Sequence, residues 1–114
     1  VPLDQYEKNL DVLVGQLKET GAVLIWAATT VVPEDEAGRI VGDDIKYNAV
    51  AAKVMQKHGI AINDLHALSK GFAGKYSKPG NVHYDQEGSG KLAEQVAASI
   101  REHLPASRPA AKTP

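Results

Sequence analysis

The fold is decided by the stretch Ala22-Val23-Leu24-Ile25-Trp26-Ala27-Ala28. Its apolar residues run continuously instead of alternating, which is typical of a strand that is covered on both faces, as in a parallel sheet. A shorter run, Ile60-Ala61-Ile62-Asn63, predicts a second strand. Between them, residues 44–58 place apolar side chains at helical spacing, and Gly59 is a good terminator. This order predicts two parallel strands joined by a helical crossover.

Two further helices are expected outside this strand–helix–strand unit. Residues 3–20 carry an apolar stripe, with Asp4 as the expected cap and Gly21 as the stop. Residues 86–103 carry another stripe, and Asp85 precedes it as a capping residue. In the middle helix the residues expected to point inward are Ile45, Val50, Val54 and Met55. The fold class predicted is therefore α/β, with Trp26 in the core.

Two parallel strands are too few to cover three amphipathic helices, because sheets of this type usually hold about five strands. Residues 1–104 are therefore predicted to form part of an α/β domain, and residues 105–114 a flexible tail. We expect the sheet to be completed by a second copy of the chain, as a homodimer or higher oligomer.

Composition narrows the function. The chain has 114 residues and a net charge of -1, which favours neither nucleic acid nor a membrane as partner. It contains no cysteine, which rules out thiolate chemistry. No phosphate-binding or dinucleotide-binding glycine motif and no HExxH is present. We expect no cofactor and no metal, and the sequence leaves the cellular compartment open.

A turn-rich stretch, Gly80-Asn81-Val82-His83-Tyr84-Asp85-Gln86-Glu87-Gly88, presents one histidine just before the last helix. Pro79 and Gly80 oppose regular structure there, which places His83 on a loop. Histidine is the side chain whose ordinary pKa lets it take and return a proton near neutral pH. His83 is therefore the candidate for chemistry, although a loop histidine can also be a plain surface residue.

An ordered series of segments resembles the C-terminal half of the SGNH (GDSL-like) esterases, over nearly the whole chain to about Leu104. The segments are Tyr6–Leu10, Val23–Thr30, Gly38–Asp44, Tyr47-Asn48, and Asn81–Tyr84 followed by Gly88. The resemblance implies a flavodoxin-like α/β/α sandwich. It also implies hydrolysis of carboxylic esters, often acetyl or other short acyl esters.

In that family a serine attacks the ester carbonyl, a histidine in the last conserved block acts as general base, and an aspartate orients the histidine. A glycine amide and an asparagine help to form the oxyanion hole. Of these residues, His83 is matched here as the base. The serine, glycine and asparagine blocks would lie before Val1. The nucleophile is therefore open, and Ser77, close to His83 in the chain, is the least implausible internal choice.

The acid also departs from the family pattern. In the family the aspartate usually lies three residues before the histidine, where this chain has Gly80. In some members it lies two residues before, where this chain has Asn81. Asparagine can hydrogen-bond an imidazole but cannot stabilise its cation by charge. Asp64, at the carboxyl end of the second expected strand, is a possible substitute, since open α/β sheets place their sites at that edge.

Other functions remain open. His58, His66, His83 and His103 could hold a metal in principle, but none has the i, i+4 spacing of a helical ligand pair. The chain could also be a catalytically inactive fragment, or a flavodoxin-like interaction module. The reading favoured here is a carboxylic ester hydrolase acting on a small-molecule ester.

Overall fold

The computed structural model describes residues 1–34 and 38–105. The elements predicted from the sequence occur in the expected order, and one further helix follows the second strand. They are α1 (Leu3–Lys18), β1 (Ile25–Ala27), α2 (Asp43–His58), β2 (Ala61–Asn63), α3 (Leu65–Gly71) and α4 (Gln86–His103). The α/β class is confirmed. The predicted tail lies almost wholly outside the described residues.

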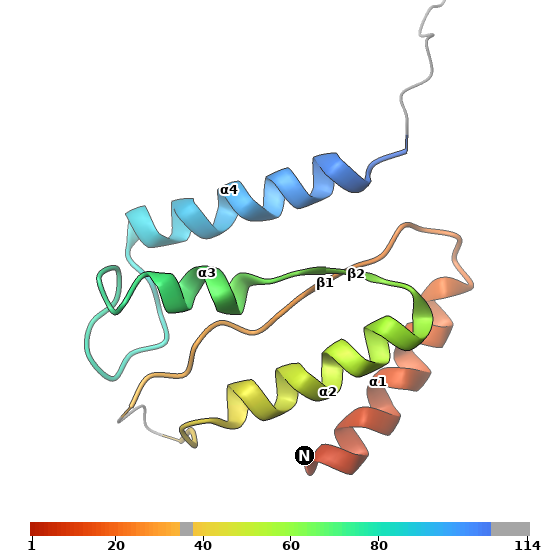
Figure 1. The fold of residues 1–114 in the computed structure, drawn as a ribbon, viewed down its shortest axis with the longest axis horizontal. Coiled ribbons are helices and arrows are strands. Elements are labelled where there is room, and N and C mark those ends of the chain that lie inside the picture. The colour runs from red at the N-terminus through yellow and green to blue at the C-terminus, as the bar shows by residue number, and fades with distance from the viewer. Residues whose placement is uncertain (35–37, 106–114) are drawn as a thin grey trace, which may run out of the picture.

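The two strands are parallel, as predicted, and Trp26 is opposite Ile62 in the register. Helix α4 contacts both strands, while α2 contacts β2 and α1 packs on α2. Figure 1 shows the resulting three layers, with α4 on one side of the strands and the α1–α2 pair on the other. Gln95 of α4 ties its layer to the sheet, since its Nε2 donates to Asn63 Oδ1 over 2.8 Å.

The core lies between the α1–α2 pair and the strands. Its fully buried members come from α1 and α2, and they are Leu10, Val14, Ala51, Val54 and Met55. Tyr6, Trp26 and Ile60 pack against this cluster, so the placement of Trp26 in the core is confirmed. The indole Nε1 of Trp26 is buried and has no hydrogen-bond partner among the described residues.

Several details differ from the sequence prediction. The first strand is three residues long instead of seven, and Val23 before it is 56% exposed. Ile45, predicted to point inward, is 60% exposed because the covered face of α2 in its first turn carries the adjacent Asp44, which is buried. Asp4 does not cap α1; the N-cap is Pro2, and the Asp4 carboxylate accepts from the adjacent Gln5 amide.

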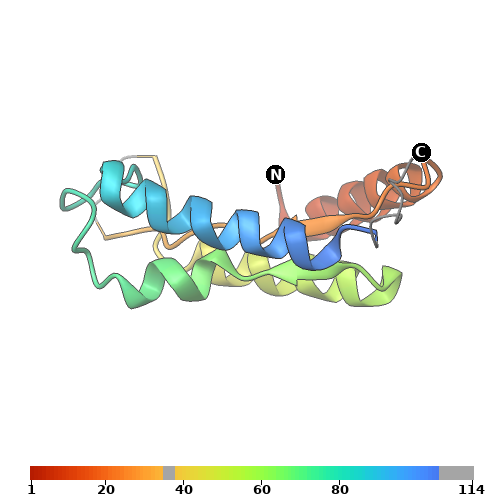
Figure 2. The same ribbon diagram turned by 90° about the horizontal axis from the view of Figure 1, so that it is seen from above.

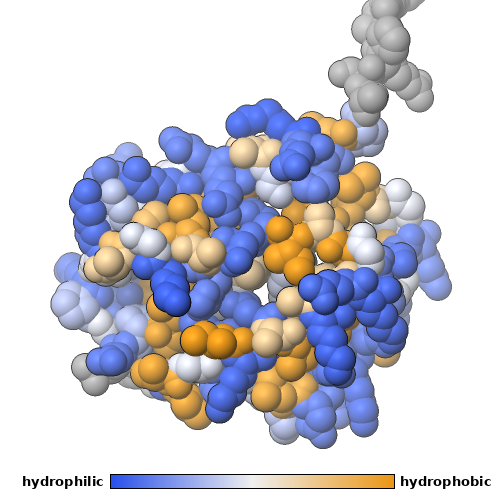
Figure 3. Space-filling view, in the orientation of Figure 1, coloured by the Kyte–Doolittle hydropathy of each residue, from blue (hydrophilic) through white to orange (hydrophobic). Residues whose placement is uncertain are grey.

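An apolar groove runs beside β1, between that strand and α1. Leu13, Leu17 and Val23 line it, together with core residues such as Val14 and Met55. Leu13 is 50% exposed there. In Figure 2, α1 lies beyond the β1 side of the strand pair, so its apolar stripe is only partly covered. Figure 3 shows apolar residues interspersed with polar ones on one face of the molecule.

The helices of the described residues are amphipathic, and none of them is both long and apolar enough to cross a membrane.

Candidate active site

The site is built from the connection between α3 and α4. Because β1 and β2 are parallel, the connections that follow them leave the sheet at the same end (Figure 1). Residues 28–34 follow β1 at that end, and residues 72–85 join α3 to α4 there. His83 thus lies on the loop beyond α3, toward the same end of the fold as the carboxyl ends of the strands, the side on which open α/β sheets bind their ligands (Figure 1).

Local sequence explains the path of this connection. The Asn81 amide donates to the Lys78 carbonyl over 3.1 Å and closes a four-residue turn. Pro79 and Gly80 occupy its centre, and Gly80 takes the positive φ of 70° that a type II turn requires at that position. The Asp85 amide then donates to the Tyr76 carbonyl over 2.7 Å, which closes the loop at the start of α4.

Aromatic packing fixes the same loop. The Phe72 ring meets Tyr76 and Tyr84 edge-on, with centroid distances of 4.9 and 5.8 Å. Gly88 of α4 lies directly against them, since a Cβ there would come within 2.5 Å of Tyr76 Cβ. The glycine at position 88 is therefore required by close approach. Asp85 caps α4 as predicted, because its Oδ1 accepts from the Gly88 amide over 2.7 Å.

A pocket of about 380 Å³ opens on this loop. Its lining consists of Lys75, Tyr76, Ser77, Lys78, Asn81, His83, Tyr84 and Asp85. His83 is exposed, and within the described residues no hydrogen bond or ion pair engages its imidazole. Both ring nitrogens of His83 are thus available to a ligand.

The other predicted site residues have separate places. Asn81 and Ser77 line the same pocket as His83. The Asn81 Oδ1 accepts from the His83 backbone amide over 2.8 Å, so it braces the loop and is not bonded to the imidazole. Asp64 is not among the lining residues; its Oδ1 accepts from the Ala67 amide over 2.9 Å and caps α3.

Sequence reasoning missed a second histidine–carboxylate arrangement. His66 Nε2 of α3 lies 2.7 Å from Asp44 Oδ2 of α2, and the Asp44 side chain is only 4% exposed. The same oxygen accepts from the Val32 amide over 3.2 Å. Burial by itself would raise the pKa of Asp44, but the hydrogen bonds with His66 and Val32 outweigh burial and hold that pKa below its usual range.

A serine completes this buried group. The Ser69 hydroxyl accepts from the Val31 amide over 3.1 Å and donates to the His66 carbonyl over 3.0 Å. Serine, histidine and aspartate are the residue types of a hydrolytic triad, but Ser69 is buried and its hydroxyl is bonded to backbone groups. The group instead ties the segment after β1 to α2 and α3. No spacing in the sequence signals it.

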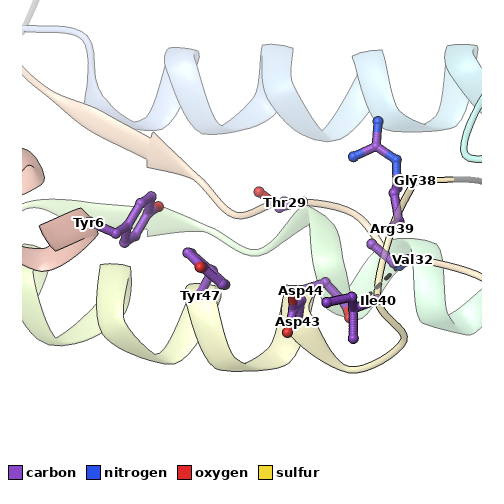
Figure 4. Close-up of a pocket in the computed structure, with 9 residues that line it drawn as sticks. All are labelled: Tyr6, Thr29, Val32, Gly38, Arg39, Ile40, Asp43, Asp44 and Tyr47. Atoms are coloured by element: carbon purple, nitrogen blue, oxygen red, sulfur yellow. Dashed lines mark hydrogen bonds between the residues drawn. The ribbon is translucent and has the colours of Figure 1, made fainter. Parts of the chain in front are cut away.

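Asn48 holds the same segment. Its Oδ1 accepts from the Thr29 amide and its Nδ2 donates to the Thr29 carbonyl, both over 2.9 Å. Figure 4 shows the residues that line a second pocket, of about 350 Å³, among them Thr29, Asp44 and Tyr47. The ring centroids of Tyr6 and Tyr47 lie 5.0 Å apart at one side of it. This pocket contains no histidine among its lining residues.

The remaining histidines have structural partners. His58 Nε2 lies 2.6 Å from Asp11 Oδ1, and His103 Nδ1 lies 2.8 Å from the Ser99 carbonyl. Within residues 1–34 and 38–105, no group of three or more His, Asp or Glu side chains is arranged to hold a metal ion. Of the four histidines, His83 is the one whose ring faces a pocket without a partner from the described residues.

Comparison with protein-family models, with curated proteins and with solved structures gave no match. The resemblance to SGNH esterases therefore rests on the series of motifs in the sequence.

Proposed function

We propose that this chain is the base-bearing part of an SGNH-type carboxylic ester hydrolase with a flavodoxin-like fold, and that His83 is its general base. The observation that carries the proposal is the unpartnered His83 imidazole, which lines a pocket on the loop between α3 and α4. A base must be free to reach the proton that it takes, and the other three histidine rings are already bonded.

The proton path is that of acyl transfer. A serine hydroxyl would give its proton to a His83 ring nitrogen as its oxygen attacks the ester carbonyl. The imidazolium would return that proton to the departing alcohol. Water would then repeat the cycle, giving its proton to His83 and releasing the acid from the acyl-serine. Ser77 is the serine that shares the pocket; otherwise a second polypeptide supplies the nucleophile.

The half-covered groove beside β1 supports the expectation that further strands complete the sheet. Exposed apolar side chains that cluster, as Leu13, Leu17 and Val23 do in this groove, mark an interaction surface. We propose a second copy of the chain as the source. Light scattering over a range of protein concentrations tests this: a dimer is expected for the wild type, and Val23→Lys, in the groove, is expected to shift it toward monomer. A monomer at all concentrations contradicts this proposal.

Ester hydrolysis tests the base. We expect purified wild type to hydrolyse p-nitrophenyl acetate and the unactivated ester ethyl acetate above the buffer rate. The unactivated ester matters because free imidazole alone attacks activated esters. His83→Ala is expected to lose the enzymatic rate, with a cost of about 10² to 10⁴, the usual contribution of a general base.

His103→Ala is the matched control, since it removes a histidine bonded to a backbone carbonyl in α4. It is expected to keep the wild-type rate. Equal loss in both variants, or no loss in His83→Ala, contradicts the assignment of the base. A wild-type rate equal to the buffer rate on both esters favours the alternative, a catalytically inactive fragment or an interaction module.

A further inference from the structure

We propose that the His83 pocket selects esters that carry a negative charge, and that Lys75 and Lys78 determine this specificity. The inference rests on the proposed function, because it names the class of ester that the same pocket would take.

The first argument is the kind of polar group that lines the pocket. Lys78 is exposed, and its ammonium has no hydrogen bond or ion pair among the described residues. Asn81 uses its side-chain oxygen for the His83 amide, which leaves its Nδ2 as a donor. The Ser77 hydroxyl and the His83 ring add further donors. A pocket lined by donors complements an anionic oxygen.

The second argument is charge. The charged side chains that line the pocket are Lys75, Lys78 and Asp85. The Asp85 carboxylate is already occupied, because its Oδ1 accepts from the Gly88 amide at the start of α4. The lining therefore carries two ammonium groups and one carboxylate, and that carboxylate already accepts a hydrogen bond from the backbone. Lys75, Lys78 and Asp85 together give the lining a net positive charge.

The third argument is that one of the lysines is held in place. Lys75 Nζ lies 5.2 Å from the Tyr76 ring centroid, and Lys91 Nζ of α4 lies 5.6 Å from the same centroid. Tyr76 is itself buried between Phe72 and Gly88. The ring thus keeps positive charge at the pocket wall, and Lys78 on the turn supplies a second, freer ammonium.

A pair of small esters isolates the effect of charge. Monomethyl succinate carries one methyl ester and one carboxylate, while dimethyl succinate has the same carbon skeleton with no charge. Binding to the wild-type chain is followed by ¹H–¹⁵N NMR, using the backbone amides of residues 75–85. We expect the anionic ester to bind about fivefold to tenfold more tightly, as two partly exposed charge pairs allow. The preference should shrink in about 1 M salt, where the Debye length is about 3 Å.

Lys75→Gln combined with Lys78→Gln removes both charges at nearly constant side-chain length. This double variant should bind the two esters equally. Lys8→Gln combined with Lys46→Gln is the matched control, because it makes the same change in net charge at exposed positions of α1 and α2. It should keep the full preference.

The proposal is overturned if the neutral ester binds as tightly as the anionic one, if the Lys75/Lys78 variant keeps the preference, or if neither ester shifts these amides. The titration needs no turnover, so it separates the two proposals. Equal binding beside His83-dependent hydrolysis overturns only the charge selection. A clear preference in a chain that hydrolyses nothing overturns only the proposed function.

Discussion

Two histidines at the same end of the sheet have opposite surroundings. His66 lies 2.7 Å from the buried Asp44 carboxylate, and its backbone carbonyl accepts from the Ser69 hydroxyl. His83 is exposed on a loop, lines a pocket, and has no partner for its ring among the described residues. The first histidine has the better acid partner, yet it is the second that a substrate can reach.

The difference shows that a triad-like set of residues is not sufficient for a site. The side chains of Asp44, His66 and Ser69 use their hydrogen-bonding atoms to connect the segment after β1 with α2 and α3. A buried group with all its partners stabilises a fold, whereas chemistry needs a group with capacity left for a ligand. Asp44 and His66 therefore stabilise the fold, and the proposed function places the chemistry at His83.

Removing the buried carboxylate should have the largest effect on stability. Asp44→Ala leaves the Val32 amide and the His66 ring without their acceptor, and we expect a loss of about 2 to 4 kcal/mol in the free energy of unfolding. Urea unfolding followed by circular dichroism measures it. The neighbouring Asp43→Ala should cost less than about 1 kcal/mol. Equal losses of unfolding free energy in the two variants would contradict the structural role of the buried Asp44.

The support of the His83 loop can be tested with two glycines of α4. Gly88→Ala places a methyl group 2.5 Å from Tyr76 Cβ, and overpacking of this kind should cost about 1 to 3 kcal/mol. At Gly90 nothing lies within 4 Å, so Gly90→Ala should instead stabilise the helix by up to about 1 kcal/mol. Thermal unfolding tests this, because Tm should fall in Gly88→Ala and rise in Gly90→Ala. A neutral Gly88→Ala would contradict the close packing behind the pocket.

Acid should weaken the Asp44 group in a defined direction. Because the folded-state pKa of Asp44 is lowered, its contribution is fully present above the ordinary carboxyl pKa of about 3.9 and is lost as pH falls through the folded-state value. The urea midpoint of the wild type should therefore drop below about pH 4. Asp44→Asn should show a smaller drop. Part of the drop remains, since the His58 hydrogen bond and then Lys57 lower the pKa of Asp11 as well.

The smallest effect on stability is expected at His83. His83→Ala removes a ring with no described partner, so its free energy of unfolding should stay within about 0.5 kcal/mol of the wild type. His66→Ala, in contrast, should be clearly destabilising because Asp44 loses its hydrogen-bonded neighbour. Urea titration of the two variants side by side checks this. A large loss in His83→Ala would mean that the loop histidine is structural.

The periodic parts of the fold could be predicted from the sequence. The last helix was placed at its observed bounds with Asp85 as its cap, and the order and direction of the two strands were right. Local signals sufficed there because capping and helical spacing act over a few residues. The exposure of Ile45 could not be predicted, since it depends on which face of α2 the other elements cover, and in the first turn that face carries Asp44.

In the candidate site, too, local features could be predicted from the sequence, whereas contacts that depend on packing could not. His83 and Asn81 were singled out from a turn signal and a motif, and the structure brings both to one pocket. Asp64 was correctly placed at the end of the second strand, but its use as a helix cap depends on α3, which was not among the helices expected from the sequence. The Asp44–His66 pair joins residues 22 positions apart. Contacts of this kind depend on how the elements pack and leave no local pattern.

The most direct test of the central contrast is hydrolysis of ethyl acetate by His83→Ala and by His66→Gln, each expressed per folded molecule at neutral pH. The proposed function predicts that His83→Ala stays folded and loses the rate, while His66→Gln loses stability but keeps the rate of its folded fraction. If His66→Gln abolishes turnover and His83→Ala leaves it unchanged, the chemistry belongs to the buried pair and the assignment of His83 is wrong.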